Sequence, residues 1–251
     1  MSILDNAAAV LRCFGAGCPS VTVTEVTARL GLPKASASRL LRAMREAGML
    51  ETIGGTKRHR PGRMMLDLAA AFRHSSRLIE RASVVVAAAA RTFGHTGYVS
   101  LREGREVTAV ADFEGSNALR VVSNIGRRLP AHLSATGRTL LARMADHEVA
   151  MLYHGTREAA LLAPILAQVR AHGYAESQQD TTPGVDAIAI AVADPASDEA
   201  VSLCLVYPHT LVPPQERAAM IGALAKGAAG IAEALGDAGF VLPQPSIEVV
   251  S

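Results

Sequence analysis

The feature that most constrains the fold is a turn followed by a helical pattern in residues 30–44. Gly31 permits a sharp backbone bend, and Pro33 suits the first position of a helix because its missing N–H would have no partner there. After the proline, apolar residues recur at the spacing of one helical face. These residues are Ala37, Leu40, Leu41 and Met44. The pattern predicts the second helix of a helix-turn-helix, with one face against a core.

The opposite face of this helix carries small, hydroxyl and guanidinium side chains. Arginine can reach phosphates or the edge of guanine, serine can bond phosphate, and small residues allow close approach to DNA. Because any amphipathic surface helix has a polar face, the neighbouring elements must support this interpretation. On this helix we expect DNA contacts from Lys34, Ser36, Ser38, Arg39 and Arg42.

The flanking segments complete a winged helix. An apolar stripe over residues 7–14 and a short helix over 23–30, capped by Thr22 or Thr24, precede the turn. Beyond Gly48, residues 49–53 and 57–60 predict two strands joined by Gly54-Gly55. We expect the wing to place Lys57, Arg58 and Arg60 along the DNA backbone or in the minor groove. A solvated charge cluster is the alternative for this basic run.

The charge is unevenly divided along the chain. Residues 1–63 carry ten lysines and arginines against four acids, a net charge of +6, although the whole chain has only +2. The remaining residues therefore carry a net charge of −4. A basic N-terminal segment followed by an acidic remainder is typical of a protein that binds a polyanion through one domain.

Composition excludes several other classes. With no Trp, 5 Phe and 4 Tyr, the chain has few rings for stacking on single-stranded bases. The three cysteines and the histidines have no zinc-site spacing, so we expect no metal and no cofactor. Reduced thiols, the lack of a signal-peptide pattern and the lack of an uncharged membrane-spanning stretch favour a cytoplasmic protein without a membrane partner.

The pattern of the second half predicts an α+β domain that a helix joins to the basic N-terminal segment. The 251 residues suffice for two modest domains. We expect a winged helix-turn-helix DNA-binding domain over 1–63, a linker helix over 64–80 and an effector-binding domain over 81–251. The alanine-rich helical pattern of 64–92 suggests a dimer seam. Expected strands are 97–101, 106–110, 119–122, 185–193 and 200–207, and expected helices are 136–144, 146–153, 160–172 and 214–235.

Two local patterns are compatible with a ligand site. In 185–193 the alanines at 187, 189, 191 and 193 share one strand face, which admits either a packed helix or a cavity. The helix start within 133–141 carries hydroxyls and a glycine, and its free N–H groups can bind an anion. Ordinary capping by Ser134 or Thr136 also explains this start.

Three blocks in order along the chain resemble the IclR family of bacterial transcriptional regulators. The first runs over 31–36 with 39–41, the second over 129–142, and the third over 172–175 with 183–189. The resemblance implies a winged helix, a linker helix and a GAF-like effector domain. It also implies a dimer or tetramer on operator DNA, controlled by a small molecule. The effector contacts that it implies are Ala135, Thr136, Ser177, Ala187, Cys204 and Val206.

Some of these positions depart from the family pattern. Many relatives have an acid at the position of Ser177, hydroxyls at those of Cys204 and Val206, and lysine at that of Arg138. The less polar residues here favour a more apolar effector than a two- or three-carbon keto acid, such as an aromatic acid or a related neutral compound. We therefore expect a DNA-binding repressor controlled by an effector such as an aromatic or other catabolic acid.

Two other functions compete with this hypothesis. The winged helix could serve as a protein-interaction module, in which case binding would lack the steep salt dependence of phosphate contacts. Alternatively, Cys204 could act as a nucleophile with His132 or His172 as the base. A thiol inside a strand is usually structural, and no other catalytic signature is present, so we expect a non-enzyme.

Overall fold

A computed structural model describes residues 2–15, 17–117 and 126–244. The chain divides into two compact units, Met1–Ser75 and Ser76–Ser251. The strand expected at 119–122 lies outside the described residues.

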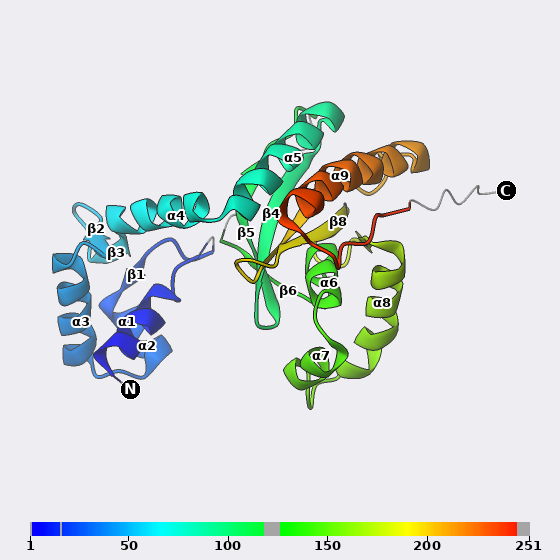
Figure 1. Cartoon of the computed structure of the whole chain (residues 1–251). Coiled ribbons are helices and arrows are strands. Elements are labelled where there is room, and N and C mark those ends of the chain that lie inside the picture. Colours follow the sequence, from blue (N-terminus) through cyan, green and yellow to red (C-terminus); the bar gives the residue numbers. More distant parts are fainter. Residues whose placement is uncertain (1, 16, 118–125, 245–251) are drawn as a thin grey trace. The chain divides into compact units, whose positions relative to one another are not determined.

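The first unit is a winged helix-turn-helix, as predicted. Its described residues form three helices, a small antiparallel sheet of strand order β1-β3-β2, and a fourth helix that follows the hairpin (Figure 1). These elements are α1 (Ile3–Leu11), β1 (Val21–Thr22), α2 (Val23–Leu30), α3 (Lys34–Glu46), β2 (Leu50–Thr52), β3 (Arg58–Pro61) and α4 (Arg63–Ser75).

Local chemistry sets the helix boundaries in this unit. Thr22 caps α2 and shares a capping box with Glu25, and Gly31 ends α2 with a φ of 65°. Pro33 lies one position earlier than predicted, at the N-cap of α3, where its carbonyl accepts the N–H of Ala37. The core lies among the three helices and the hairpin. It contains Val10, Val21, Val26, Ala37, Leu40, Leu41, Met44 and Leu50.

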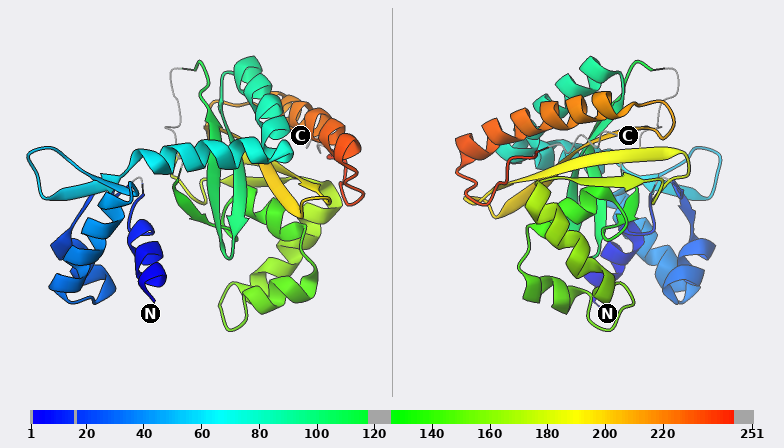
Figure 2. Two further views of the ribbon diagram at one scale, coloured as in Figure 1. Left: turned by 60° about the vertical axis from the view of Figure 1, so that its left-hand side comes forward. Right: turned by 90° about the vertical axis from the view of Figure 1, so that its right-hand side faces the viewer.

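The second unit is an α+β domain. Its described strands form an antiparallel sheet of order β6-β5-β4-β9-β8-β7. Helices α5 and α9 cover one face of this sheet and α6 covers the other, with α8 packed against α6 (Figures 1 and 2). The strands are β4 (Thr96–Glu103), β5 (Glu106–Phe113), β6 (Arg128–Pro130), β7 (Ala175–Gln178), β8 (Val185–Asp194) and β9 (Glu199–Pro208). The helices are α5 (Arg77–Phe93), α6 (Ala135–Ala142), α7 (Asp146–Leu152), α8 (Ala159–His172) and α9 (Pro214–Leu235).

Two features differ from the expected pattern. The short edge strands β6 and β7 were not predicted. The continuous helical pattern of 64–92 is interrupted at Ser76, whose hydroxyl accepts the N–H of Ile79 and caps α5. The break separates α4 from α5 and coincides with the division between the two units.

The core of the second unit lies mainly between the sheet and the pair α5 and α9. Helix α9 is long and apolar enough to cross a membrane by length and composition. However, it packs on α5 and β8 and buries Met220, Leu224 and Ala228 completely. These contacts are those of a core helix.

Candidate nucleic-acid interface and ligand pocket

Helix α3 presents its polar face to solvent. The apolar residues Ala37, Leu40, Leu41 and Met44 are buried against α1, α2 and β2, so the opposite side is free. Of the residues predicted on this face, Ser36 is half-buried and the others are exposed. The exposed ones are Lys34, Ser38, Arg39 and Arg42.

The hairpin of β2 and β3 places its three predicted cations in different settings. Lys57 lies in the loop between the strands and is exposed. Arg60 is on β3, where it pairs across the hairpin with Glu51 at 3.1 Å between Nη2 and Oε2. The side chain of Arg58 points instead toward the start of α2.

Arg58 joins the hairpin to the helical part of the unit. Its Nη2 lies 3.2 Å from Oε2 of Glu25, and its Nε donates to Ser20 Oγ at 2.8 Å. Nη2 also donates to the carbonyl of Ser20. The Thr22 N–H bonded to Glu25, together with Arg58, lowers the pKa of that carboxyl. Arg58 therefore supports the hairpin, whereas Lys57 has its charge at the exposed turn.

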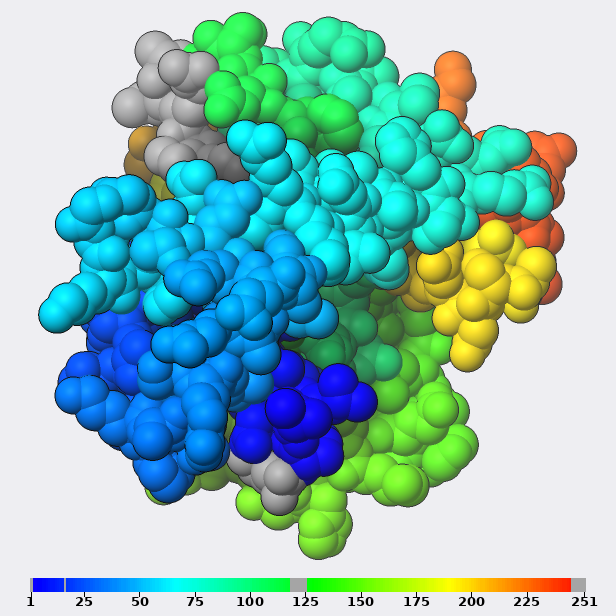
Figure 3. Space-filling model, turned by 90° about the vertical axis from the view of Figure 1, so that its left-hand side faces the viewer, coloured from blue at the N-terminus to red at the C-terminus, as the bar shows by residue number. Residues whose placement is uncertain are grey.

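Figure 3 shows a face of the molecule on which α4, drawn in cyan, lies at the surface. None of the α4 residues is buried. Its exposed large apolar side chains are those of Met64, Leu66, Leu68 and Phe72.

In the second unit, a pocket lies between the start of α6 and the sheet face that α6 covers. Its boundaries enclose about 630 Å³ of empty space, part of it open to solvent. The structure brings all six predicted effector contacts to this pocket. They are Ala135, Thr136, Ser177, Ala187, Cys204 and Val206.

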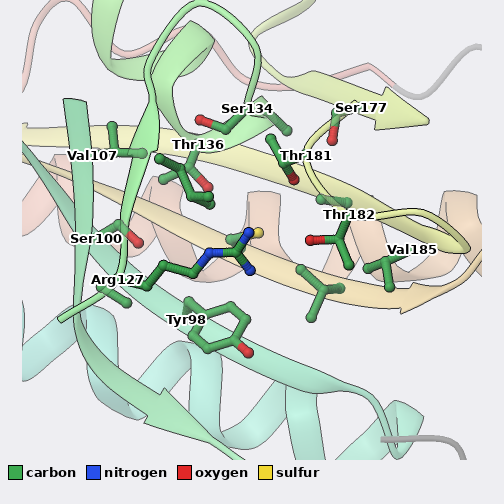
Figure 4. A pocket seen from close by; sticks show the side chains of 16 residues that line it. Tyr98, Ser100, Val107, Arg127, Ser134, Thr136, Ser177, Thr181, Thr182 and Val185 are labelled. Atoms are coloured by element: carbon green, nitrogen blue, oxygen red, sulfur yellow. The ribbon is translucent and has the colours of Figure 1, made fainter. Parts of the chain in front are cut away.

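The start of α6 forms one wall of the pocket (Figure 4). Ser134 caps the helix by accepting the N–H of Gly137 at 3.0 Å. Gly137 itself lies so close to the backbone of Ala131 that a Cβ there would overlap it. Arg138 then ties α6 to the loop after β7 through an ion pair with Asp180 at 3.0 Å. Capping and the pocket wall therefore coexist at one helix start.

The alanine face of β8 both packs against a helix and lines the cavity, which are the two alternatives that its pattern allowed. Ala191 pairs with Ser202 of β9, whose hydroxyl lies 2.9 Å from Thr139 Oγ1 of α6. The helix therefore covers the sheet at this level. Further along, Ala187 pairs with Val206, and both line the pocket. The alternate residues of β8, Ile188, Ile190 and Val192, face the core on the other side of the sheet.

Several lining residues were not predicted. Tyr98 and Ser100 come from β4, Thr181 and Thr182 from the loop before β8, and Arg127 precedes β6. Figure 4 shows the Arg127 side chain extending into the middle of the pocket, between Thr136 and Tyr98. The alternation of β4 indicates which residues share a face. An arginine in a loop gives no such signal.

Comparison with known proteins identifies the chain. A family model described as "Bacterial transcriptional regulator IclR C-terminal" matches residues 70–233, and one described as "IclR helix-turn-helix domain" matches residues 3–54. The chain belongs to the IclR family. It is thus a helix-turn-helix transcriptional regulator, as the three sequence blocks predicted.

Among IclR-family relatives, the regulator XynR of Escherichia coli K12 is 26% identical over 201 residues, covering 75% of this chain and 79% of XynR. The transcriptional repressor IclR of the same organism is 24% identical over 187 residues, covering 70% of this chain and 68% of that protein.

Solved IclR-family structures share the fold. One from Silicibacter sp. TM1040 aligns with a TM-score of 0.82 at 22% identity, over 97% of this chain and 99% of that chain. An IclR homologue from Microbacterium hydrocarbonoxydans, solved with 4-hydroxybenzoate, aligns with a TM-score of 0.78 at 22% identity. It covers 94% of this chain and 100% of that chain.

The IclR assignment agrees with the state of the candidate nucleophile. Cys204 is 1% exposed, and burial raises the pKa of its thiol to about 12. A thiol with this pKa stays protonated at neutral pH and is a poor nucleophile. Its relatives are named as transcriptional regulators, in agreement with the expectation of a non-enzyme. Among the described residues, no cluster of three histidine, cysteine or acidic side chains could hold a metal ion.

Proposed function

We propose that this IclR-family protein is a sequence-specific regulator, acting as a repressor, whose binding to operator DNA is controlled by a small-molecule effector. The observation that carries the proposal is the convergence of six predicted effector contacts on one pocket of the second unit, in a chain whose first unit is a winged helix. The 4-hydroxybenzoate complex of the Microbacterium hydrocarbonoxydans homologue supports an aromatic or related catabolic acid as the effector.

In the first unit, we assign base and phosphate contacts to the exposed face of α3 and to the hairpin. Arg39 and Arg42 would reach into the major groove, and Lys34, Ser36 and Ser38 would contact the backbone near the start of α3. In the hairpin, Lys57 would contact phosphate. Arg58 and Arg60, which pair with Glu25 and Glu51, would hold the hairpin in place for this contact.

The protein would act as a homo-oligomer, a dimer or a tetramer, in the cytoplasm. The row of exposed apolar residues on α4, with Leu66 67% and Leu68 57% exposed, supports pairing with a second copy. Light scattering on the purified chain measures the oligomeric state, and a monomer at micromolar concentration would contradict this part of the proposal.

The test is binding of the purified protein to the intergenic DNA upstream of its own gene. Fluorescence anisotropy would compare that duplex with a scrambled one at low and near-physiological salt. Preferential binding that persists at the higher salt, and that responds to a ligand of the pocket, is the expected result. Equal and salt-labile binding to both duplexes would contradict specificity. Binding to neither duplex would favour the protein-interaction module.

A further inference from the structure

The ligand pocket contains a single kind of charge. Among the described residues that line it, Arg127 is the one ionised side chain, and no carboxylate is present. The other polar lining groups are hydroxyls and a thiol. They belong to Tyr98, Ser100, Ser134, Thr136, Ser177, Thr181, Thr182 and Cys204. The pocket is therefore electropositive.

Arg127 differs from its neighbour Arg128 in what it contacts. Arg128 pairs with Glu103 at 2.7 Å and with Glu106 at 3.1 Å, outside the pocket. Within the part of the chain that the structure describes, no acid forms an ion pair with Arg127. A half-buried guanidinium without a counter-ion is unfavourable, because protein groups replace water around it without neutralising its charge. A carboxylate on a bound molecule could supply this counter-ion.

We propose that Arg127 is the residue that determines effector specificity, and that it selects a ring-sized monocarboxylate. This inference rests on the effector control proposed above. A guanidinium can hold a carboxylate through two parallel hydrogen bonds. The hydroxyls of Thr136 and Thr182, which lie on either side of the Arg127 head in Figure 4, can complete the hydrogen bonding of the acid. With one cation in the pocket, a second carboxylate would lack a partner, so dicarboxylates should bind less well.

The remaining walls define the body of the ligand. Val107 and Ala109 of β5, Ala187 of β8 and Val206 of β9 present small or branched apolar surfaces, and Leu129 adds another. The short side chains of Ala109 and Ala187 leave space above the sheet instead of filling it. A flat apolar ring can lie against such a surface.

The experiment measures ligand binding to the full chain by isothermal titration calorimetry, with thermal shift as a second readout. The probes are acids paired with their neutral amides: benzoate with benzamide, 4-hydroxybenzoate with 4-hydroxybenzamide, and phenylacetate with phenylacetamide. Arg127→Gln is the test variant. Arg128→Gln is the matched control, because it removes the same charge one residue away and outside the pocket.

The unmodified protein should bind at least one acid about tenfold or more tightly than its amide, as expected of a charge-assisted contact. Arg127→Gln should abolish this preference, because it should lower the affinity for the acid and leave the affinity for the amide unchanged. Arg128→Gln should retain the preference. The proposal is overturned if no acid in the series binds, if acid and amide bind equally, or if Arg127→Gln keeps the preference.

Operator binding without ligand separates this proposal from the function on which it rests. If the operator is bound specifically and is released only by neutral compounds, the regulator assignment stands and the role of Arg127 fails. If operator binding is also absent, both are contradicted.

Discussion

Arg58 in the hairpin and Glu25 in α2, 33 residues apart in the sequence, form an ion pair with 3.2 Å between Nη2 and Oε2. Both side chains are 40% exposed, and Glu25 also accepts the N–H of Thr22 at the start of α2. One acid thus joins a helix cap to the wing. Counting partners only among the described residues, the cations of the wing consequently divide into Arg58 and Arg60, which support it, and Lys57, which has no acidic partner at the turn.

Replacing a supporting cation and replacing the free one should affect different properties. Arg58→Ala should lower the melting temperature of the first unit by a few degrees, because Ser20 and Glu25 lose their partner. Lys57→Ala should leave the melting temperature unchanged. It should reduce the slope of log affinity against log salt by about one phosphate contact. Calorimetry and salt-dependent anisotropy would measure the two effects. If Arg58→Ala behaved as predicted for Lys57→Ala, Arg58 would be a DNA contact instead.

Replacing Arg39 tests base reading by α3. If its guanidinium makes a bidentate contact with guanine, Arg39→Ala should cost roughly 1–3 kcal/mol of operator affinity and reduce discrimination against a scrambled duplex. Arg12→Ala is the matched control, because Arg12 is exposed at the end of α1 and carries the same charge. Equal losses in both variants would indicate a general charge effect.

Gly137 should resist substitution although it lies in a helix. Alanine favours helices by roughly 0.5–1 kcal/mol over glycine. A Cβ at position 137 would overlap the backbone of Ala131, so Gly137→Ala should displace the start of α6, weaken ligand binding and destabilise the protein. Gly230→Ala in α9 should stabilise it, because a Cβ there meets nothing within 4 Å. Chemical denaturation measures the change in the free energy of unfolding for both variants. Stabilisation by Gly137→Ala would show that the backbone of Ala131 can move to accommodate the Cβ.

His95 should make the stability of the second unit depend on pH. It is 5% exposed, and desolvation lowers its pKa despite the opposing effect of Glu216, 3.6 Å from its Nε2. Asn117 and the Tyr207 ring also face it. Because the unfolded chain takes up a proton first, at about pH 6.5, stability should fall as the pH decreases below this value.

Denaturation midpoints at several pH values between 5 and 7 would measure this dependence. In a His95→Gln variant the slope of the midpoint against pH should be smaller. In a variant of the exposed His154 this slope should be unchanged. A slope that persists in His95→Gln would assign the proton uptake to another group.

The sequence predicts those elements that carry their own periodic signal. The apolar spacing of α3 and the alternation of β8 define both elements and the faces they bury. In contrast, β6 and β7 are short edge strands, and the residues Ala175–Gln178 of β7 have no apolar alternation. Their extended conformation comes from pairing with β5 and β8, which sequence patterns do not reveal.

The candidate sites show the same division. The six pocket residues were implied by the family resemblance, and the structure places them together. Arg127 could not be found in this way, because its importance depends on which sheet face it approaches. Similarly, Arg58 is recognisable in the sequence as a cation, but its neutralising partner Glu25 is on another element. Long-range pairing is the information that the sequence lacks.

The alternation of β8 separates two kinds of evolutionary change on a single strand. Ala187 faces the pocket and its neighbour Ile188 faces the core, so substitutions at one need not disturb the other. A lineage can therefore acquire a new effector by altering the pocket-lining residues of β8 and β9 while the packing under α5 and α9 is kept. Ligand preference can thus diverge on one scaffold, because pocket and core residues occupy alternate positions of the same strand.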